Sequence, residues 1–376
     1  MPRLLIIIGE ASGDLHGANL ATALRSLRPD IELLGIGGEN MRAAGVTIIH
    51  RSEGLDTIGL VGIGQVLEAW KTYKIVDRAF QEQSLDAVVL IDHPGVNLHL
   101  ARLARRRRQR VIYYISPQVW AWKPGRIRKI QRNVDHMLVI LPFEEAFYRE
   151  AGVSCTFVGH PLLDAITLKE GRSTLRRRFG FTETDTVIGL LPGSRKHEVS
   201  SLFPIMLESM VRLRKGRPGL KGIVAQAQTI GAELLTEPMA HCPVPCQVVR
   251  DQANEVMAVA DLLLVASGTA TLQAALIGTP MIIMYRAMWF TTWLAKQIVL
   301  VPYMGLVNLV AGRKVVPELL QQQATVDRVS AEAERLLTHP QVYEKMKADL
   351  RRVQQLMGLP GASLRAAEIV IEQCKI

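Results

Sequence analysis

Residues 260–286 read "ADLLLVASGTATLQAALIGTPMIIMYR". The apolar run at 262–265 predicts a buried strand, and Ser267-Gly268-Thr269 directly after it predicts the start of a helix. Gly278-Thr279-Pro280 ends that helix, and a second apolar run follows at 281–285. A strand, a helix and a strand in this succession favour parallel strands joined by a crossover helix, and hence an α/β fold.

The turn at 267–269 has the chemistry of an anion site. The free N–H groups of the first helical turn, the hydroxyls of Ser267 and Thr269 and the positive end of the helix dipole converge there. Gly268 has no Cβ to block the approach of a ligand. In the alternative interpretation, the hydroxyls only cap the helix.

A second turn of this kind lies in "VIGLLPGSRKHEV", residues 187–199. It places Gly193, Ser194 and Arg195 straight after a strand, where the planar fork of an arginine can clamp a diphosphate. Glu198 is placed to orient that arginine. Without the first turn, Arg195 could equally be a surface residue of a strand–helix loop.

Strands and helices alternate along the whole chain, which at 376 residues is long enough for two domains. Amphipathic helices are predicted between the strands, for example at 14–28 and 64–83. We expect strands at 3–8, 31–36, 46–49, 86–91, 111–115, 137–141 and 155–158, and a second series at 187–191, 222–225, 247–249, 262–265 and 281–285.

A charged stretch after residue 166 marks the predicted domain boundary. We therefore expect two Rossmann-like, doubly wound α/β domains, residues 1–165 and 166–345, facing across a cleft. Residues 346–376 are predicted to be helices that either return to the first domain or exchange with a partner subunit in a homodimer.

The composition limits the kinds of partner. A net charge of +10 favours an anionic one: a phosphorylated substrate, an anionic membrane or a nucleic acid. The four cysteines follow no common zinc spacing, so we expect no metal. The most apolar region, 281–312, is interrupted by Arg286 and Lys296, which predicts contact with a bilayer surface instead of a membrane span.

An acidic turn follows the first strand, where a phosphate-binding turn would be expected. In "LLIIIGEASGDLHGANLATAL", residues 4–24, two carboxylates stand where they would repel phosphate. In the alternative interpretation, Ser12 and Asp14 only cap the following helix. The side chains and backbone that we expect to meet the hydroxyls of a sugar acceptor are those of Glu10, Ser12, Gly13, Asp14 and His16.

Another strand end carries a candidate base. "DAVVLIDHPGVN", residues 86–97, delivers Asp92 at the carboxyl end of a buried strand, with His93 beside it. A carboxylate in this position can take a proton from an attacking hydroxyl. Asp92 is the predicted base, and His93 and Glu10 are the alternatives. Asp92 could also serve only as the first residue of an Asx turn.

Basic and aromatic residues are interleaved in one part of the chain. Between Arg102 and Arg132 there are eleven basic residues and no acidic ones. Tryptophan beside basic residues suits a lipid headgroup region, although a solvated basic helix with core aromatics has the same pattern. The side chains that we expect at a lipid surface are Trp120, Trp122, Lys123, Arg126, Arg128, Lys129, Trp289, Phe290 and Trp293.

These motifs together resemble a known family. "LLPGSRKHEV" and "ASGTATLQAALIGTPMIIMYR" are similar to the donor half of B-type glycosyltransferases. Six other motifs resemble those of the lipid-A-disaccharide synthase family, and they occur in the same order over nearly the whole chain. They are "GEASGDLHGA", "IDHPGVN", "YYISPQVWAWKPGRIRKI", "LPFEEAFY", "VGHPLLD" and "VNLVAGR".

The resemblance implies an enzyme that transfers a diacylated glucosamine from UDP to the 6-hydroxyl of a diacylglucosamine 1-phosphate. It also implies inversion at the anomeric carbon, no metal or other cofactor, and a cytoplasmic enzyme attached to the inner membrane surface. It adds Asn97 and Asn308 to the acceptor contacts. The UDP contacts that it implies are Gly193, Ser194, Arg195, Glu198, Ser267, Gly268, Thr269, Ala270 and Gln273.

Two positions depart from the family pattern. B-type transferases commonly have a glutamate that holds the ribose diol where this chain has Gln273, and an amide binds a diol without the charge-assisted gain. Val96 stands where phenylalanine is more common, which we interpret as a packing change.

Two other classes of protein stay open. A UDP-sugar 2-epimerase has similar paired domains, but it has no use for a basic, aromatic membrane rim. A basic lipid- or nucleic-acid-binding protein without catalysis would share the charge, but no RNA-binding motif is present and the anion turns suit a small diphosphate. We therefore expect no nucleic acid as a partner.

Overall fold

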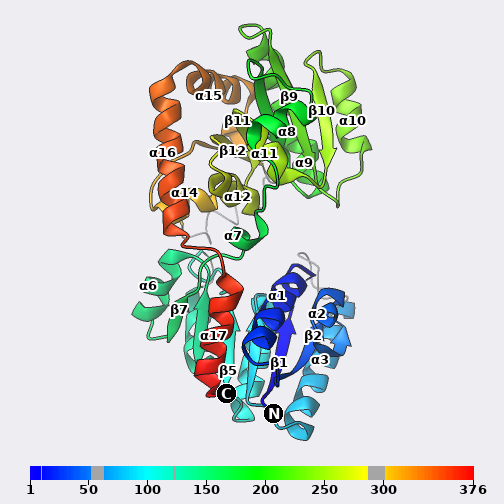
Figure 1. The fold of residues 1–376 in the computed structure, drawn as a ribbon, viewed down its shortest axis with the longest axis vertical. Helices are drawn as coiled ribbons and strands as arrows, with labels where there is room; N and C mark the ends of the chain where they lie inside the picture. The colour runs from blue at the N-terminus through cyan, green and yellow to red at the C-terminus, as the bar shows by residue number, and fades with distance from the viewer. Residues whose placement is uncertain (10, 52–62, 122–123, 287–300) are drawn as a thin grey trace. The chain divides into compact units, whose positions relative to one another are not determined.

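Five consecutive apolar residues, Leu4 to Ile8, form most of strand β1 (Arg3–Ile8), and each is at most 1% exposed. Such a continuous apolar run is expected of a strand that is covered on both faces. The computed structural model describes residues 1–9, 11–51, 63–121, 124–286 and 301–376, and it places β1 inside a parallel sheet (Figure 1).

Within the described residues, the first sheet has seven strands in the order β3-β2-β1-β4-β5-β6-β7, and every neighbouring pair is parallel. The order changes direction between β1 and β4, which makes their carboxyl ends the switch point where doubly wound sheets bind ligands. The other strands are β2 (Glu32–Gly37), β3 (Thr47–Arg51), β4 (Ala87–Ile91), β5 (Val111–Tyr114), β6 (His136–Val139) and β7 (Cys155–Phe157).

Helices cover both faces of this sheet, and α1 and α17 lie side by side on one of them (Figure 1). The opposite face packs against α3 and α4. The helices are α1 (Ala11–Leu27), α2 (Glu39–Ala43), α3 (Ile63–Glu82), α4 (Pro94–Arg106), η1 (Pro124–Arg126), α5 (Ile127–Asn133), α6 (Pro142–Glu150), α7 (Leu162–Ala165) and α17 (Ala362–Cys374).

The second sheet has six strands among the described residues, in the order β10-β9-β8-β11-β12-β13, again all parallel. Its strands are β8 (Thr186–Leu191), β9 (Leu220–Gln226), β10 (Cys246–Arg250), β11 (Leu262–Ala266), β12 (Met281–Tyr285) and β13 (Glu318–Leu320). Its helices are α8 (Arg172–Arg178), α9 (Lys196–Arg214), α10 (Glu233–Ala240), α11 (Ala253–Val259), α12 (Thr269–Ile277), α14 (Leu306–Ala311), η2 (Gln321–Gln323), α15 (Val326–Thr338) and α16 (Pro340–Leu356).

The chain forms two compact units, one of Met1–Asp164 with Leu359–Ile376 and one of Ala165–Gly358. Helix α16, which crosses the predicted boundary at 345/346, lies wholly in the second unit, and α17 lies in the first. The predicted α/β class with two doubly wound sheets is confirmed, and every predicted strand is found within two residues of its expected ends. Strand β13 was not predicted.

Asp14 joins two helices of the first unit. Its carboxylate is buried and accepts hydrogen bonds from the backbone amides of Gly38 (2.7 Å), Asn40 (2.9 Å) and Met41 (3.3 Å). These amides belong to the start of α2, so Asp14 of α1 caps the next helix. This differs from both sequence-based interpretations, which gave Asp14 to a sugar acceptor or to the N-terminus of its own helix.

Replacing Asp14 by alanine is expected to lower the free energy of unfolding by about 2 kcal/mol, because three backbone amides at the start of α2 lose their carboxylate acceptor. Urea denaturation followed by circular dichroism measures the change. Asp30→Ala is the matched control: among the described residues Asp30 is exposed and pairs with Arg28, so its loss is expected to cost far less stability than the loss of Asp14. Equal stability of the two variants would contradict the capping role.

Candidate active site

A cavity of about 590 Å³ lies in the second unit, at the carboxyl ends of β8 and β11. It is lined by the two turns that the sequence predicted to be anion sites, at 193–195 and 267–269. The nine residues predicted to contact UDP all line it: Gly193, Ser194, Arg195, Glu198, Ser267, Gly268, Thr269, Ala270 and Gln273. The structure therefore brings together, in one cavity, residues that are 80 positions apart in the sequence (from 193 to 273).

The turn between β11 and α12 presents backbone amides to this cavity. Helix α12 begins at Thr269, and no described side chain caps it. The hydroxyl of Ser267 donates to the carbonyl oxygen of Met304 at 3.2 Å, so it is directed away from the helix end. A Cβ added at Gly268 would meet none of the described atoms within 4 Å, so the glycine borders open space. The first amides of α12 are thus free to bind an anion.

The turn between β8 and α9 is held from inside by Glu198. The Glu198 carboxylate is buried, accepts from Nη1 of Arg195 at 2.8 Å and accepts from the amide of Ser194 at 3.3 Å. Gly193 has φ of +117°, and a Cβ there would lie 2.5 Å from the Glu198 carboxylate. Thr229, which the sequence did not indicate, donates to the carbonyl of Ser194 at 2.6 Å. The orientation of Arg195 by Glu198 is as expected.

Gln273 has a partner that sequence reasoning missed. Its Nε2 donates to Oδ1 of Asn254 at 2.5 Å, and both side chains line the cavity. The pair leaves the Oε1 of Gln273 as an acceptor and the Nδ2 of Asn254 as a donor. An adjacent acceptor and donor match the two hydroxyls of a ribose, each of which can donate and accept. The only available signal for Asn254 was its place after the end of strand β10.

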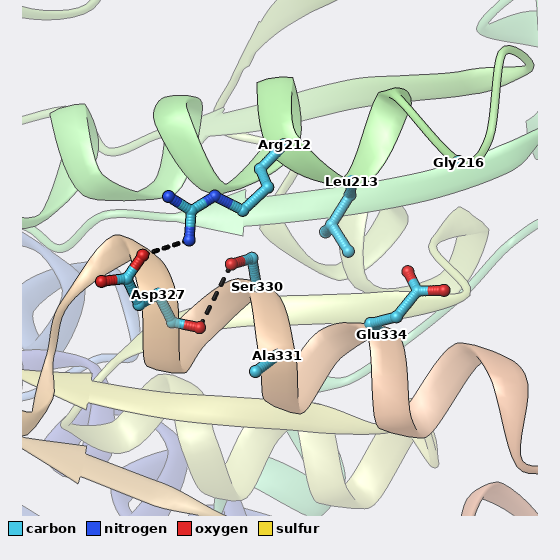
Figure 2. Close-up of a pocket in the computed structure, with 7 residues that line it drawn as sticks. All are labelled: Arg212, Leu213, Gly216, Asp327, Ser330, Ala331 and Glu334. Atoms are coloured by element: carbon cyan, nitrogen blue, oxygen red, sulfur yellow. Dashed lines mark hydrogen bonds and ion pairs between the residues drawn. The ribbon is translucent and has the colours of Figure 1, made fainter.

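A second hollow of the same unit, of about 350 Å³, lies between α9 and α15. Figure 2 shows that an ion pair joins Arg212 to Asp327 and that the Ser330 hydroxyl donates to the backbone carbonyl of Asp327. Glu334, also drawn there, pairs with Arg217, and the hollow contains none of the predicted site residues. Arg212 is therefore a suitable control position for substitutions at the donor cavity.

In the first unit, Asp92 follows β4 at the switch point of the sheet. Asp92 and His93 have φ of +51° and +41°, a left-handed conformation that is uncommon for residues with side chains. Strained backbone of this kind is typical of functional sites. Gly9, at the end of β1, makes room for it, because a Cβ there would lie 2.2 Å from the Cβ of His93.

The surroundings of Asp92 suit a general base. Burial raises the pKa of the Asp92 carboxyl above its ordinary value, and the amide of His93 and the charges of His93 and His16 oppose this rise. Burial lowers the pKa of His16, and the nearby Asp92 partly offsets that effect. A carboxylate with a raised pKa binds a proton more strongly, so it is a better general base. Asp92 and His16 therefore lie close together, as expected of two residues predicted to belong to one acceptor site.

His160 belongs to the same cluster and was missed. It follows β7, is buried, and its Nδ1 accepts from the amide of Leu162 at 3.1 Å. Burial lowers its pKa to about 4, and His16 adds to the effect. The ring is therefore neutral at pH 7 and carries its proton on Nε2. The signal that could have found it is the motif "VGHPLLD", which puts His160 just beyond a strand end.

Two asparagines predicted to contact the acceptor are buried and make their hydrogen bonds inside the protein. Nδ2 of the buried Asn97 donates to the carbonyls of Ile91 and Asp92. Asn308 is 0% exposed; its Nδ2 donates to Val316 O and Glu318 Oε1, and its Oδ1 accepts from the amides of Val315 and Val316. All four hydrogen-bonding positions of Asn308 are used. The prediction for Asn308 is therefore wrong, and its role is to fix the turn after α14.

Trp120 does not lie at a lipid surface. It is 9% exposed, its Nε1 donates to the fully buried Glu144 at 2.9 Å, and its ring meets Phe143 edge to face. The prediction for Trp120 is wrong because the indole N–H has an internal acceptor. Arg128 and Lys129 are exposed on α5, while Arg126 is half-buried. Trp70, which was not among the predicted residues, is 56% exposed on α3, with the Lys74 ammonium 3.5 Å from its ring centre.

Several predicted residues lie outside the described residues: Glu10, Trp122, Lys123, Trp289, Phe290 and Trp293. Gly13 and His16 lie in the first turns of α1, as does the backbone of Ser12. Among the helices of the described ranges, none is long and apolar enough to cross a membrane. The same ranges contain no cluster of three histidine, cysteine or carboxylate side chains that could hold a metal ion.

Solved structures with this fold are known. The chain is similar to UDP-GlcNAc 2-epimerase from Neisseria meningitidis, solved with UDP-GlcNAc bound, with a TM-score of 0.66 and 10% identity over 98% of this chain and 100% of that one. MurG of Acinetobacter baumannii has a TM-score of 0.62 and 13% identity, over 99% and 100% of the two chains. At such low identity these similarities establish the fold, that of B-type glycosyltransferases and related epimerases, and nothing more.

The sequence relatives are much closer. The lipid-A-disaccharide synthase of Geobacter metallireducens is 42% identical over 374 residues, which cover 98% of this chain and 97% of that protein. The enzyme of the same name from Myxococcus xanthus is 39% identical over 99% and 97% of the two chains. The family model described as lipid-A-disaccharide synthetase matches residues 4–370. The chain therefore belongs to the lipid-A-disaccharide synthase family, whose members are glycosyltransferases.

Proposed function

We propose that this chain joins two acylated glucosamines. It transfers 2,3-diacylglucosamine from UDP to the 6-hydroxyl of 2,3-diacylglucosamine 1-phosphate, with inversion, and gives a β-1,6-linked disaccharide 1-phosphate and UDP. The observation that carries the proposal is the single cavity lined by all nine predicted donor-site residues, in a chain of this family. The epimerases share only the fold with this chain, at 10–11% identity.

The donor half of the proposed reaction uses the cavity of the second unit. The amides at the start of α12 and the guanidinium of Arg195 bind the diphosphate, and both stabilise the negative charge that develops as UDP leaves. The Gln273–Asn254 pair holds the ribose hydroxyls. Since both of these side chains are neutral amides, their part of the donor affinity does not depend on pH.

The acceptor half uses the strand ends of the first unit. Asp92 takes the proton from the 6-hydroxyl as its oxygen attacks the anomeric carbon, and the bond to UDP breaks on the opposite face of the sugar. Burial supports this role because it raises the pKa of Asp92. The neutral rings of His16 and His160 can exchange hydrogen bonds with sugar hydroxyls without competing for that proton.

Arg195→Lys is expected to raise the KM for the UDP-sugar roughly tenfold, because an ammonium cannot grip a diphosphate with two parallel hydrogen bonds. Initial rates of UDP release at varied donor concentration measure the change. Arg212→Lys is the matched control: Arg195 stands just before α9, Arg212 lies in the last turn of that helix at the hollow shown in Figure 2, and its replacement should leave the KM unchanged. A normal KM for Arg195→Lys would remove this arginine from the donor site.

Asp92→Asn is expected to lower kcat by roughly 100-fold or more while UDP still binds, since the amide cannot accept the proton. Turnover is followed as UDP release, and UDP binding by calorimetry. Asp86→Asn tests the other end of the same strand: the Asp86 carboxylate accepts from the amide of Arg3, so the variant should keep near-normal turnover. If Asp92→Asn also keeps its turnover, another group is the base.

We further propose that the protein binds to the inner membrane surface through α3, α4 and α5 of the first unit, which pack in succession. Arg102 and Arg106 are exposed on α4, and Arg128 and Lys129 on α5, so four cations lie on neighbouring helices. Anionic lipid attracts such groups by about 1 kcal/mol each. Trp70 on α3 supplies an aromatic ring suited to the headgroup region. The partners are thus the two lipid substrates and the membrane.

The double variant Arg128→Gln/Lys129→Gln is expected to bind anionic vesicles roughly 30-fold more weakly, because two surface cations at about 1 kcal/mol each are lost. Co-sedimentation with phosphatidylglycerol vesicles at low salt measures the binding. Arg351→Gln/Arg352→Gln removes the same charge from an exposed pair on α16 and should have little effect. Equal losses in both variants would mean that only net charge matters.

A further inference from the structure

The backbone carbonyl of Asp92 accepts two side-chain hydrogen bonds. The hydroxyl of Tyr113 donates to it at 2.5 Å, and Nδ2 of Asn97 donates at 2.8 Å. Asn97 also donates to the carbonyl of Ile91 at 2.9 Å, and its own amide donates to the carbonyl of His93 at 3.2 Å. Three consecutive carbonyls, those of residues 91, 92 and 93, are therefore tied to Asn97, and the middle one is shared with Tyr113.

These contacts act on two consecutive residues of uncommon backbone conformation. Asp92 and His93 are both left-handed, and no glycine relieves either position. A turn of this kind relaxes unless its surroundings fix it. Asn97 holds it from the first turns of α4 and Tyr113 from the neighbouring strand β5, so two separate elements fix the same peptide group.

Neither donor touches solvent or has another evident use. Tyr113 and Asn97 are both 0% exposed, so they do not contact a substrate. A buried tyrosine hydroxyl needs an acceptor, but the core could satisfy that need without a strained turn. Tyr114, the next residue of β5, is equally buried and lies in the hydrophobic cluster on the other face of the sheet.

We propose that Tyr113 and Asn97 are positioning residues for the sugar transfer: they fix the peptide of Asp92 so that its carboxylate stays directed at the acceptor hydroxyl. This inference rests on the proposed role of Asp92 as the base. The groups that face the Asp92 carboxylate are His93 on the same turn and His16 of α1, and the charge of Asp92 also reaches Tyr113 of β5. Loosening the turn lets water reach the carboxylate and changes all of these distances.

The test compares Tyr113→Phe with Tyr114→Phe. Each removes one buried hydroxyl from adjacent residues of one strand. Among the described residues the Tyr114 hydroxyl has no hydrogen-bond partner, whereas the Tyr113 hydroxyl donates to Asp92, so Tyr113→Phe should cost more stability and the two variants are compared by kcat and pH profile. Only Tyr113→Phe is expected to lower kcat, by roughly 10- to 100-fold, as a small displacement of a reacting group does. The KM for the UDP-sugar should stay at the wild-type value in both, because that site is built in the second unit.

The pH profile separates positioning from a purely structural role. In the wild type, kcat/KM should fall at acid pH as Asp92 takes up a proton, with a midpoint above the ordinary aspartate pKa because burial raises it. In Tyr113→Phe the carboxylate gains water, so its pKa falls and the acid limb should move to lower pH. In Tyr114→Phe the limb should not move. Asn97→Ser should lower kcat and move the acid limb of the pH profile as Tyr113→Phe does. It replaces Tyr113→Phe in the test if that variant does not fold.

If Tyr113→Phe matches Tyr114→Phe in both kcat and acid limb, the positioning role is wrong even though Asp92 is the base. Asp92→Asn is measured beside them to keep the two questions apart. An active Asp92→Asn protein would overturn the choice of base, and with it this inference, whatever the tyrosine variants do.

Discussion

Every neighbouring strand pair in the two sheets is parallel, so the carboxyl ends of the strands lie along one edge of each sheet. A parallel strand can be followed only by a crossover, and here the crossovers are mostly helices that begin within a few residues of the strand end. The short turn between strand and helix is therefore the place where backbone amides and side chains meet at one edge. The proposed chemistry of this chain lies in such turns and in the first turns of the helices that follow them.

The turns of the two sheets carry side chains of opposite chemical character. In the second unit, the turns after β8 and β11 present an arginine and uncapped amides, and the buried carboxylate of Glu198 orients the arginine from behind. In the first unit, the turns after β4 and β7 and the first turns of α1 present a carboxylate and neutral imidazoles. The first arrangement suits a diphosphate, and the second suits a hydroxyl that must lose a proton. One architecture thus supports both halves of a transfer reaction.

The sequence predicted the strands well because continuous apolar runs such as Leu4 to Ile8 have few other structures open to them. It missed β13, which has three residues and includes the polar Glu318. Donor-site residues were predictable because turn and helix start are adjacent in sequence. Asn254 and Thr229 were not, because each acts through a partner that only the folded chain brings near.

The three site predictions that the structure contradicts failed for one physical reason. Asp14, Asn308 and Trp120 are polar or amphipathic residues in motifs, and each has its hydrogen bonds satisfied inside the protein. Sequence shows that such a residue needs a partner, but it does not show whether the partner is a ligand or a buried amide. Asp14 answers the question raised by the acidic turn after β1: at least one of its carboxylates caps a neighbouring helix.

The central claim is that the second unit holds the nucleotide and the first unit activates the acceptor. A crystal structure of the protein with UDP tests it most directly. The account predicts the diphosphate within hydrogen-bonding distance of the amides of Thr269 and Ala270 and of the Arg195 guanidinium, with the ribose at Gln273 and Asn254. Uridine bound instead against residues 9–16, with the cavity of the second unit empty, would contradict it.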